Sequence, residues 1–549
     1  MPVNTDSFRL NARSLSVAFF LGLALFVGVF IVFFPGAKDG TLVLDDLHVI
    51  YNLATVKDMP WLEGYINYLF QHRGYFDRPI SYLTFYLQKQ SLDAGLYPFK
   101  LFNIVLHAVN TVLVFALIVQ ILRTRYLSLN RFLLITAAVL AFLWAVSTIQ
   151  VSTVLYATQR MTLLSATFSL LALLVFGYLR KQNDIRLQLS GLLFVVCPLI
   201  VLGFLCKENA FLVFLYLLVL DGTVYNKMPA HKWYLVWRRL FVLLPILLLV
   251  LYFVSDIERH FIANFSFREF DVGERFLTQH RIVLEYIAKF FFPFVYHFGV
   301  INTEFAVSHS FVQPISTSIS FVLIWGAIFA AFYYRHKKPL LCFGVLFFFA
   351  GHAMESSVLS LELYFEHRNY LPVAGLVMVM AAGVISFYEK VAQEQSVRIG
   401  RLASLFAVIM ASVYLIFVVV KTRAEVELWT NPVRQAFVWY THSPKSQRAH
   451  SHLGSTLFSY GLYKEAASLY QQTNHLFPGD ISKDLLWLEL VCVSPDIHLP
   501  DKSALLDKAK SADYQREAII IINSLLSLLE SGRCKNLPRT GVPRIGGQV

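Results

Sequence analysis

Charged residues are scarce in this chain of 549 residues, where they make up 15% and hydrophobic residues make up 57%. So little charge excludes a soluble multidomain protein, whose domains would each need a polar surface. The chain also lacks a Walker pattern and a glycine-rich dinucleotide turn, which argues against a soluble nucleotide substrate. The net charge of +12 falls mainly in short loops between apolar segments, so we expect a multi-pass membrane protein and no nucleic-acid binding.

Apolar segments that can cross a bilayer recur along the whole chain. We predict about eleven of them, near residues 15–34, 99–122, 131–148, 161–179, 187–205, 208–221, 239–255, 316–334, 340–353, 371–388 and 402–420. The segment 288–300 is apolar but contains Pro293, and we expect it to be interfacial or re-entrant. The predicted fold is therefore an all-α polytopic helix bundle, whose first segment is retained because it has no small-residue cleavage site.

Basic residues fall in alternate loops of this arrangement. Arg9 and Arg13 precede the first apolar segment, so the positive-inside rule predicts a cytoplasmic amino terminus. The opposite, outer face then carries the first loop (35–98), the turns at 149–160 and 207–208, the loop 256–315, the segment 354–370 and everything after residue 421. Almost every unusual polar residue of the chain lies in this set.

Hydropathy falls after residue 420, so we predict a membrane domain over 1–420 and a soluble helical domain over 421–549, on the outer face. A helix–turn–helix repeat of about 34 residues, the tetratricopeptide repeat, fits a start at Gln447. The matching residues are Leu453, Gly454, Ala466, Tyr470 and Pro478. One unit cannot bury both faces, so flanking helices near 424–440, 481–493 and 503–530 would complete the stack. The domain is either a helical cap or a docking surface for a protein acceptor.

The five cysteines divide between the two predicted domains. Cys197, Cys206 and Cys342 lie in apolar segments, where buried thiols usually serve packing. Cys492 and Cys534 lie in the exported domain, where an oxidising compartment allows a disulfide. The sequence leaves open whether these two pair.

Two adjacent carboxylates, Asp45 and Asp46, follow the first apolar segment and precede His48. On the outer face they predict an active site, with a solvated turn as the alternative. Further along the loop, Asp77 and Arg78 precede a proline that favours the first turn of a helix. A guanidinium beside free helix N–H groups suits a phosphate. The alternative is that Asp77 and Arg78 form a structural ion pair.

A second dense polar patch contains Glu355, Glu362 and Glu366, with spacings of seven and four that would place them on one face of a helix. Like charges beside a bilayer need partners, and His367, Arg368 or the distant Lys207 could supply them. Such a face could also hold a divalent cation, which prefers oxygen ligands, although no spacing here is a metal signature. The leading alternative is a salt-bridge network that holds the outer loops together.

Two polar pairs, Gln159–Arg160 and Lys207–Glu208, interrupt apolar segments at their outer ends. Cations at the membrane border are candidates for binding a phosphate-bearing lipid headgroup. The alternative is that they are snorkelling anchors.

The combination of these motifs resembles the GT-C class of integral-membrane glycosyltransferases. The resemblance covers most of the chain and is nearest to the transmembrane and tetratricopeptide-repeat O-mannosyltransferases and to bacterial pilin arabinofuranosyltransferase-type enzymes. It rests on the acidic pair, on the turn Lys207-Glu208-Asn209, on the terminal repeat unit, and on two stretches of the first loop and its following helix, Arg78-Pro79-Ile80-Ser81-Tyr82-Leu83-Thr84-Phe85 and Pro98-Phe99-Lys100-Leu101-Phe102-Asn103-Ile104-Val105-Leu106-His107-Ala108-Val109-Asn110. Eukaryotic members carry long repeat arrays, and the one convincing unit here favours a bacterial inner-membrane enzyme with a periplasmic terminal domain.

The resemblance implies transfer of a sugar from a polyprenyl-phosphate carrier to a pilin or another surface protein. One residue of the pair Asp45 and Asp46 would be the general base, while Arg78, Arg160 and Lys207 would face the leaving phosphate. Three alternatives stay open: a glycolipid, lipopolysaccharide or oligosaccharide transferase, a lipid-glycan transporter, and a scaffold built on the repeat domain. Transporters often show internal repeats in hydropathy, and this chain shows none.

Overall fold

A computed structural model describes the chain apart from residues 1–11, 39, 41, 72–76, 127–129, 257–264, 266–267, 395, 474–475, 477–480, 495–496, 498–515, 531, 533 and 535–549. The described residues form helices and connecting turns, with no strand among them. They divide into two compact units, one of residues 1–300 and 305–430 and the other of residues 301–304 and 431–549. The all-α prediction is therefore confirmed for the described part of the chain.

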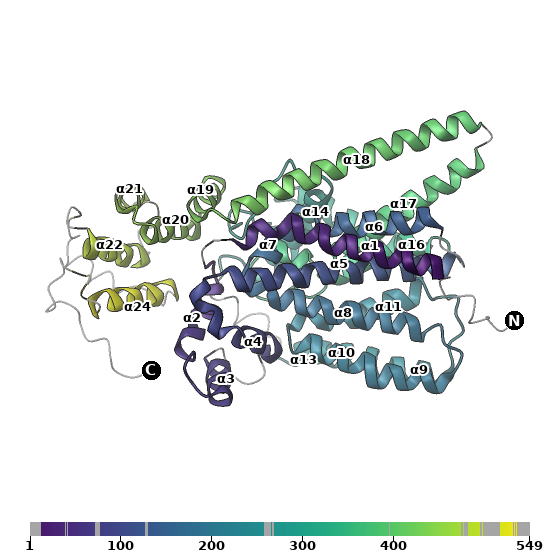
Figure 1. Ribbon diagram of the computed structural model, residues 1–549, viewed down its shortest axis with the longest axis horizontal. Helices are drawn as coiled ribbons and strands as arrows, with labels where there is room; N and C mark the ends of the chain where they lie inside the picture. The colour runs from purple at the N-terminus through teal and green to yellow at the C-terminus, as the bar shows by residue number, and fades with distance from the viewer. Residues whose placement is uncertain are drawn as a thin grey trace. The chain divides into compact units, whose positions relative to one another are not determined.

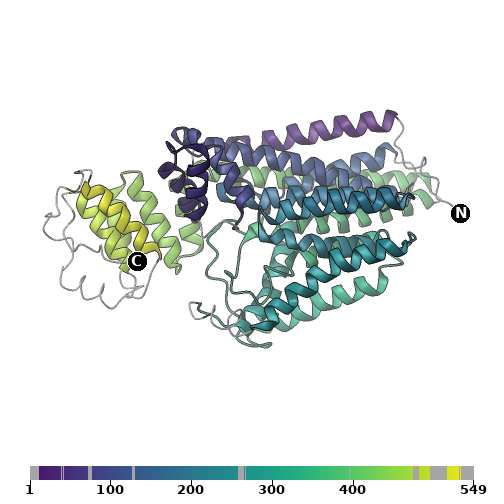
Figure 2. The same ribbon diagram turned by 90° about the horizontal axis from the view of Figure 1, so that it is seen from below.

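The first unit is a bundle of long helices that run side by side, with the short helices α2, α3 and α4 gathered at one end (Figures 1 and 2). Its α-helices are α1 (Ala12–Phe33), α2 (Asp46–Thr55), α3 (Trp61–Phe70), α4 (Pro79–Tyr86), α5 (Tyr97–Arg125), α6 (Arg131–Ala145), α7 (Val151–Leu155), α8 (Arg160–Leu179), α9 (Ile185–Gly191), α10 (Cys197–Phe204), α11 (Val213–Thr223), α12 (Lys232–Arg238), α13 (Leu244–Ser255), α14 (Val272–Phe291), α15 (Ser316–Tyr334), α16 (Pro339–His352), α17 (Val373–Gln393) and α18 (Val397–Leu428).

Eight helical segments of the described chain are long and apolar enough to cross a membrane. They cover 14–37, 97–125, 157–179, 185–204, 232–252, 316–334, 373–393 and 398–428, and the pair α6 and α7, bent by 51°, gives a ninth if it is one span. The predicted spans 208–221 and 340–353 correspond to the shorter α11 and α16. A multi-pass membrane protein is therefore supported, whereas the number eleven stays a prediction.

The segment around Pro293 follows an amphipathic helix, α14, that is not among the candidate spans. A capping box between Asp271 and Glu274 starts α14. The helix ends at Phe291, before Pro293, and buries the cationic side chains Arg275 and Lys289. The interfacial or re-entrant placement of the segment 288–300 stays a prediction.

The predicted cytoplasmic loops meet one another through ion pairs and hydrogen bonds. Arg125 pairs with Glu389 at 2.8 Å, joining the end of α5 to α17. Asp221 lies between Arg180 and Arg238, at 2.8 Å from each. These contacts join loops that the positive-inside rule assigned to the same side.

The second unit contains α19 (Pro432–His442), α20 (Gln447–Ser459), α21 (Tyr463–Thr473), α22 (Ile481–Val493) and α24 (Arg516–Glu530). Gly461, with a φ of 74°, forms the turn between α20 and α21. A Cβ at Gly454 would meet the ring of Tyr470, so α20 and α21 approach closely there. The predicted helix–turn–helix unit is present, but its tetratricopeptide character stays a prediction and Pro478 lies outside the described residues.

Two further expectations concern this end of the chain. Cys492 and Cys534 form a disulfide, which answers the question that the sequence left open. The predicted domain boundary after residue 420 falls inside α18, which continues to Leu428. The division into compact units instead follows Thr430.

Candidate functional site

Four separate segments converge at the end of the first unit that carries α2, α3 and α4. The first loop contacts the turn before α8, because the Asp46 carboxylate accepts a 2.7 Å hydrogen bond from the Thr158 N–H. It also contacts the turn before α11, because the Ser81 hydroxyl donates to the Cys206 carbonyl at 2.8 Å. The segment 354–370 joins the same cluster through Glu355, which lies 3.9 Å from Lys207.

The two aspartates of the acidic pair have different environments. Asp45 is exposed, and its backbone N–H donates to the Tyr156 hydroxyl at 2.8 Å. Asp46 is 2% exposed. Its carboxylate accepts hydrogen bonds from the Thr158 N–H and hydroxyl and from the Val43 N–H. Solvent therefore reaches Asp45, whereas Asp46 holds the loop against the start of α8.

Burial raises the pKa of Asp46 from 3.8 to about 7, against the opposing effects of Thr158, Val43 and the positive charge of Lys100. Lys100 on α5 is itself buried, and its ammonium group donates to the Trp429 carbonyl at 3.4 Å. A Cβ at Gly40, which has a φ of 115°, would collide with that ammonium group. The glycine therefore lets the first loop pass close to Lys100.

Arg78 starts α4 with a left-handed backbone, at φ 56° and ψ 44°. Its Nε donates to Glu208 at 2.8 Å and its NH2 group makes a second bond to the same carboxylate. Among the described residues, its NH1 group contacts a weak acceptor, the Met161 sulfur, at 3.4 Å. Asp77 lies 3.7 Å from the guanidinium, so both the helix-start prediction and the local ion pair are present.

Lys207 and Arg368 both approach the carboxylate of Glu355, at 3.9 and 3.7 Å. The Lys207 ammonium group also donates to the Thr162 hydroxyl at 2.9 Å. Burial lowers the pKa of Lys207, although the charge of Glu355 opposes this. Burial and the positive charges of Lys207, Arg368 and Arg78 lower the pKa of His367 well below its ordinary value.

The start of α8 links the acidic pair to the cationic cluster. Thr158 binds Asp46, Met161 contacts Arg78, and Thr162 binds Lys207. Thr158 and Thr162 are separated by about one helical turn, or about 5.4 Å along the axis. The Asp46 carboxylate and the two cations Arg78 and Lys207 thus contact residues of one short stretch, 158–162.

Gln159 and Arg160 are buried within this turn and are bound by protein groups. The guanidinium of Arg160 donates at 3.1 Å to each of three acceptors, the Asn103 side chain and the carbonyls of Thr84 and Phe99. Gln159 accepts a 2.7 Å bond from Thr162. Arg160 therefore joins α4, α5 and α8, and its five N–H groups are largely committed before any phosphate is bound.

The prediction that Glu355, Glu362 and Glu366 share one face of a helix is wrong. The segment 353–365 forms turns and bends rather than a helix. Each carboxylate accordingly has its own partner: Glu355 has Lys207 and Arg368, Glu362 has Arg268 at 2.7 Å, and Glu366 has Lys289 at 2.9 Å. This is the salt-bridge network that the sequence offered as the alternative, and it joins the segment to α14 and to the turn before α11.

Glu366 and His48 complete the set of predicted site residues. Glu366 is 2% exposed and also accepts hydrogen bonds from the Gly299 N–H. Burial raises its pKa, which the charge of Lys289 opposes. His48 lies half-buried on α2, two residues after Asp46. Within the described ranges, no three His, Cys, Asp or Glu side chains lie close enough together to hold a metal ion.

Comparison of the chain with protein-family models, with curated proteins and with solved structures finds no match in any of the three.

Proposed function

We propose that the chain is a membrane glycosyltransferase that moves a sugar from a polyprenyl-phosphate carrier to a protein acceptor on the periplasmic face. The observation that supports this proposal best is the turn that starts α8. Tyr156, just before this turn, accepts a hydrogen bond from the backbone N–H of the exposed Asp45, and within the turn Met161 contacts Arg78 and Thr162 binds Lys207. The cluster lies at one end of a bundle of apolar helices, where a lipid-linked donor presents its headgroup.

Asp45 acts as the general base in this proposal. Its carboxylate takes the proton of an acceptor hydroxyl, and the hydroxyl oxygen bonds to the anomeric carbon of the sugar. The bond between that carbon and the phosphate oxygen breaks, and its electron pair leaves with the lipid phosphate. Asp46 is a positioning residue, because its carboxylate is enclosed by Thr158 and Val43.

Arg78 and Lys207 stabilise the leaving phosphate. The NH1 group of Arg78 exchanges the weak Met161 sulfur for a phosphate oxygen, while Glu208 keeps the guanidinium oriented. The Lys207 ammonium group lies nearly 4 Å from the Glu355 carboxylate and donates to the Thr162 hydroxyl, so it turns toward an anion without breaking a close ion pair. Arg160 holds α4 and α5 in place rather than binding the phosphate.

The test compares membranes that contain the wild-type chain, Asp45→Asn or Asp58→Asn, each supplied with labelled polyprenyl-phosphate sugars. Asp58 is the matched control, because it is an exposed aspartate in the same loop. We expect Asp45→Asn to lose at least about 100-fold in label transfer, the lower range for general-base catalysis, and Asp58→Asn to keep the wild-type rate. Equal rates in all three at equal expression would refute the catalytic assignment.

The fraction that receives label identifies the acceptor class. Label in protein supports a protein acceptor, docked by the tetratricopeptide-like second unit, and label only in lipid would show a glycolipid transferase instead. If Asp45→Asn is silent while removal of residues 431–549 abolishes function, the chain is a scaffold.

A further inference from the structure

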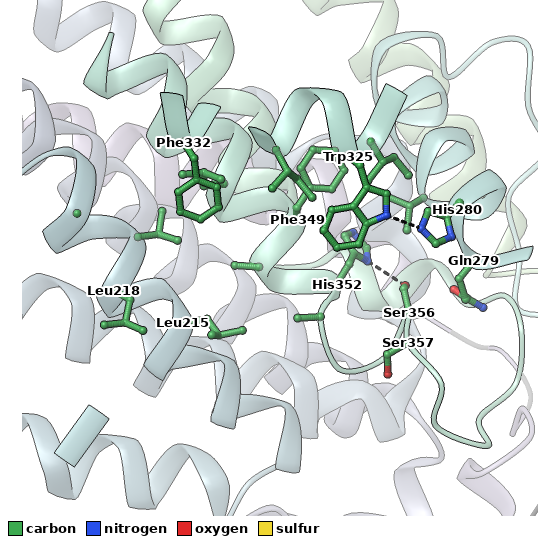
Figure 3. Close-up of a pocket in the computed structure, with 18 of the residues that line it drawn as sticks. Leu215, Leu218, Gln279, His280, Trp325, Phe332, Phe349, His352, Ser356 and Ser357 are labelled. Atoms are coloured by element: carbon green, nitrogen blue, oxygen red, sulfur yellow. Dashed lines mark hydrogen bonds between the residues drawn. The ribbon is translucent and has the colours of Figure 1, made fainter. Parts of the chain in front are cut away.

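A mostly apolar groove of about 580 Å³ lies among α11, α14, α15 and α16 (Figure 3). Ten of its 21 described lining residues are leucine, isoleucine, valine or phenylalanine. Leu215, Leu218, Phe332 and Phe349 are among those drawn. Its volume is in the range of small-molecule sites. Along α15 it extends from Trp325 to Arg335, about 15 Å at the helical rise per residue.

The two ends of the groove differ in charge. Gln279, His280, Ser356 and Ser357 line the end beside the candidate site, and none of them carries a permanent charge. Arg335 lines the other end, and it alone of the described lining residues is permanently charged. A ligand that fits this groove therefore has an aliphatic chain and an anionic group at the Arg335 end.

The neutral end offers hydrogen bonds but no available cation. The Trp325 N–H donates to His280 at 3.2 Å, and Gln279 donates to the Leu363 carbonyl at 2.8 Å. The amide oxygen of Gln279, Oε1, is buried and has no hydrogen-bond partner among the described residues. It points toward the Ser356 side of the groove (Figure 3). The nearby Arg275 already donates to the carbonyls of Leu361, Glu362 and Glu355.

The cationic end is open to an anion. Arg335 donates one NH1 bond to the Phe332 carbonyl of its own helix. The next residues, His336, Lys337 and Lys338, are exposed, and none of them is acidic. Asp221 precedes the lining residue Gly222 in the sequence, and its carboxylate is held by Arg180 and Arg238. A cation at the end of an apolar groove between helices suits an anionic lipid headgroup.

We propose that this groove binds an anionic phospholipid, with its phosphate at Arg335 and one acyl chain running between α15 and α16 toward Gln279. The lipid fills the space on the inner side of α15, a helix of which only 22% of the apolar window is buried by protein. It enters from the end opposite the candidate site, so this inference does not depend on the proposed function. Binding stabilises the folded bundle in proportion to the lipid available.

Two glycines provide a matched pair of variants. A Cβ at Gly222 or at Gly326 meets no atom within 4 Å, so either position accepts a larger side chain. Gly222 lines the groove and Gly326 does not. Gly222→Leu therefore fills the groove, and Gly326→Leu adds the same side chain to α15 outside it.

The experiment uses full-length protein in nanodiscs of mixed phosphatidylglycerol and phosphatidylcholine, followed by native mass spectrometry of the lipid that is lost last. The wild type, Gly326→Leu and Lys337→Gln should retain one phosphatidylglycerol. Arg335→Gln should lower the preference for phosphatidylglycerol roughly fivefold, the effect of one basic residue, and Gly222→Leu should lose the retained lipid.

Three results would overturn the proposal. Gly222→Leu could retain as much lipid as Gly326→Leu, or the wild type could show no preference between the two lipids. Polyprenyl phosphate added to the nanodiscs could also replace phosphatidylglycerol as the retained lipid and be lost in Gly222→Leu but not in Arg335→Gln. That last result would assign the groove to the chain of the sugar donor. Arg335→Gln keeps the test valid if Gly222→Leu fails to fold.

Discussion

The buried carboxyl of Asp46 makes the stability of the protein depend on pH in a way that one substitution should remove. Below pH 3.8 the carboxyl is protonated in the folded and the unfolded chain. As the pH rises from 3.8 to about 7, the unfolded chain loses this proton while the folded chain keeps it. Stability therefore falls across this range and the loss is complete above about pH 7.

The size of this effect follows from the two pKa values. The difference between 3.8 and about 7 corresponds to about 4 kcal/mol at about 1.36 kcal/mol per pKa unit. Asp46→Asn keeps the shape and an acceptor for Thr158, but its NH2 group faces the Val43 N–H, which donates to the native carboxylate. Two opposed donors cost about 1–3 kcal/mol, and this cost is independent of pH.

Asp46→Asn should therefore be less stable than the wild type at pH 4 and more stable at pH 8. The difference between the two proteins should change by about 4 kcal/mol over this interval. The measurement is thermal unfolding of the purified full chain in detergent at pH 4 to 8. Comparing the two proteins at each pH cancels the titration of all other groups.

Thr158→Val is the matched control, because it removes a donor to the Asp46 carboxylate and keeps the carboxyl itself. Losing that donor disfavours the charged form and raises the pKa of Asp46 further. This variant should keep the fall in stability and extend it to higher pH. A constant difference between Asp46→Asn and the wild type from pH 4 to 8 would refute the reasoning.

Three other substitutions test the packing of the two units. Lys289→Met leaves the Glu366 carboxylate buried without its cation, which should lower the free energy of unfolding by about 3–5 kcal/mol. In thermal unfolding, the double variant Lys289→Met/Glu366→Gln should recover part of this lost stability. Equal stability of the single and the double variant would contradict the prediction. Cys492→Ser removes the disulfide with Cys534, which lies 42 residues away in the sequence, and the loop-entropy model assigns about 4 kcal/mol to such a link. The urea concentration at which half of the second unit is unfolded should therefore fall. Reductant should lower this midpoint by the same amount in the wild type. Gly454→Ala should lose about 1–3 kcal/mol by overpacking, measured by the same urea titration, and an unchanged midpoint would refute the close approach of α20 and α21.

Hydropathy predicts the long membrane helices well because their apolar composition is a local property. The segment predicted at 99–122 is found as α5, Tyr97–Arg125, and the one at 316–334 as α15. Two other predicted segments correspond to shorter helices, so their assignment as spans stays a prediction. α11 has 11 residues and α16 has 14, and both are shorter than the bilayer core requires.

The partners of the predicted site residues could not be predicted, because they come from distant segments. Tyr156 and Thr158 lie 111 and 112 residues from the aspartates that they contact. In the sequence, Lys100 is marked only by the stretch 98–110, on which the glycosyltransferase resemblance partly rests. Its neighbours in the sequence do not indicate that its charge acts on Asp46. The sequence offers one signal for these contacts. Polar residues, Thr158 and Thr162, stand at the two ends of a short turn between apolar segments.

Arg78 shows where a local rule and a tertiary requirement differ. A residue before proline is expected in an extended conformation, yet Arg78 adopts the left-handed region, which costs a residue other than glycine about 1–2 kcal/mol. The two bonds to Glu208, 130 residues away, offset this cost and direct the guanidinium toward α8. The strained backbone thus belongs to Arg78, the residue that joins the first loop to the cationic cluster. Arg78 reaches the proposed phosphate site through contacts with residues distant in the sequence, so a short stretch of sequence does not predict its position.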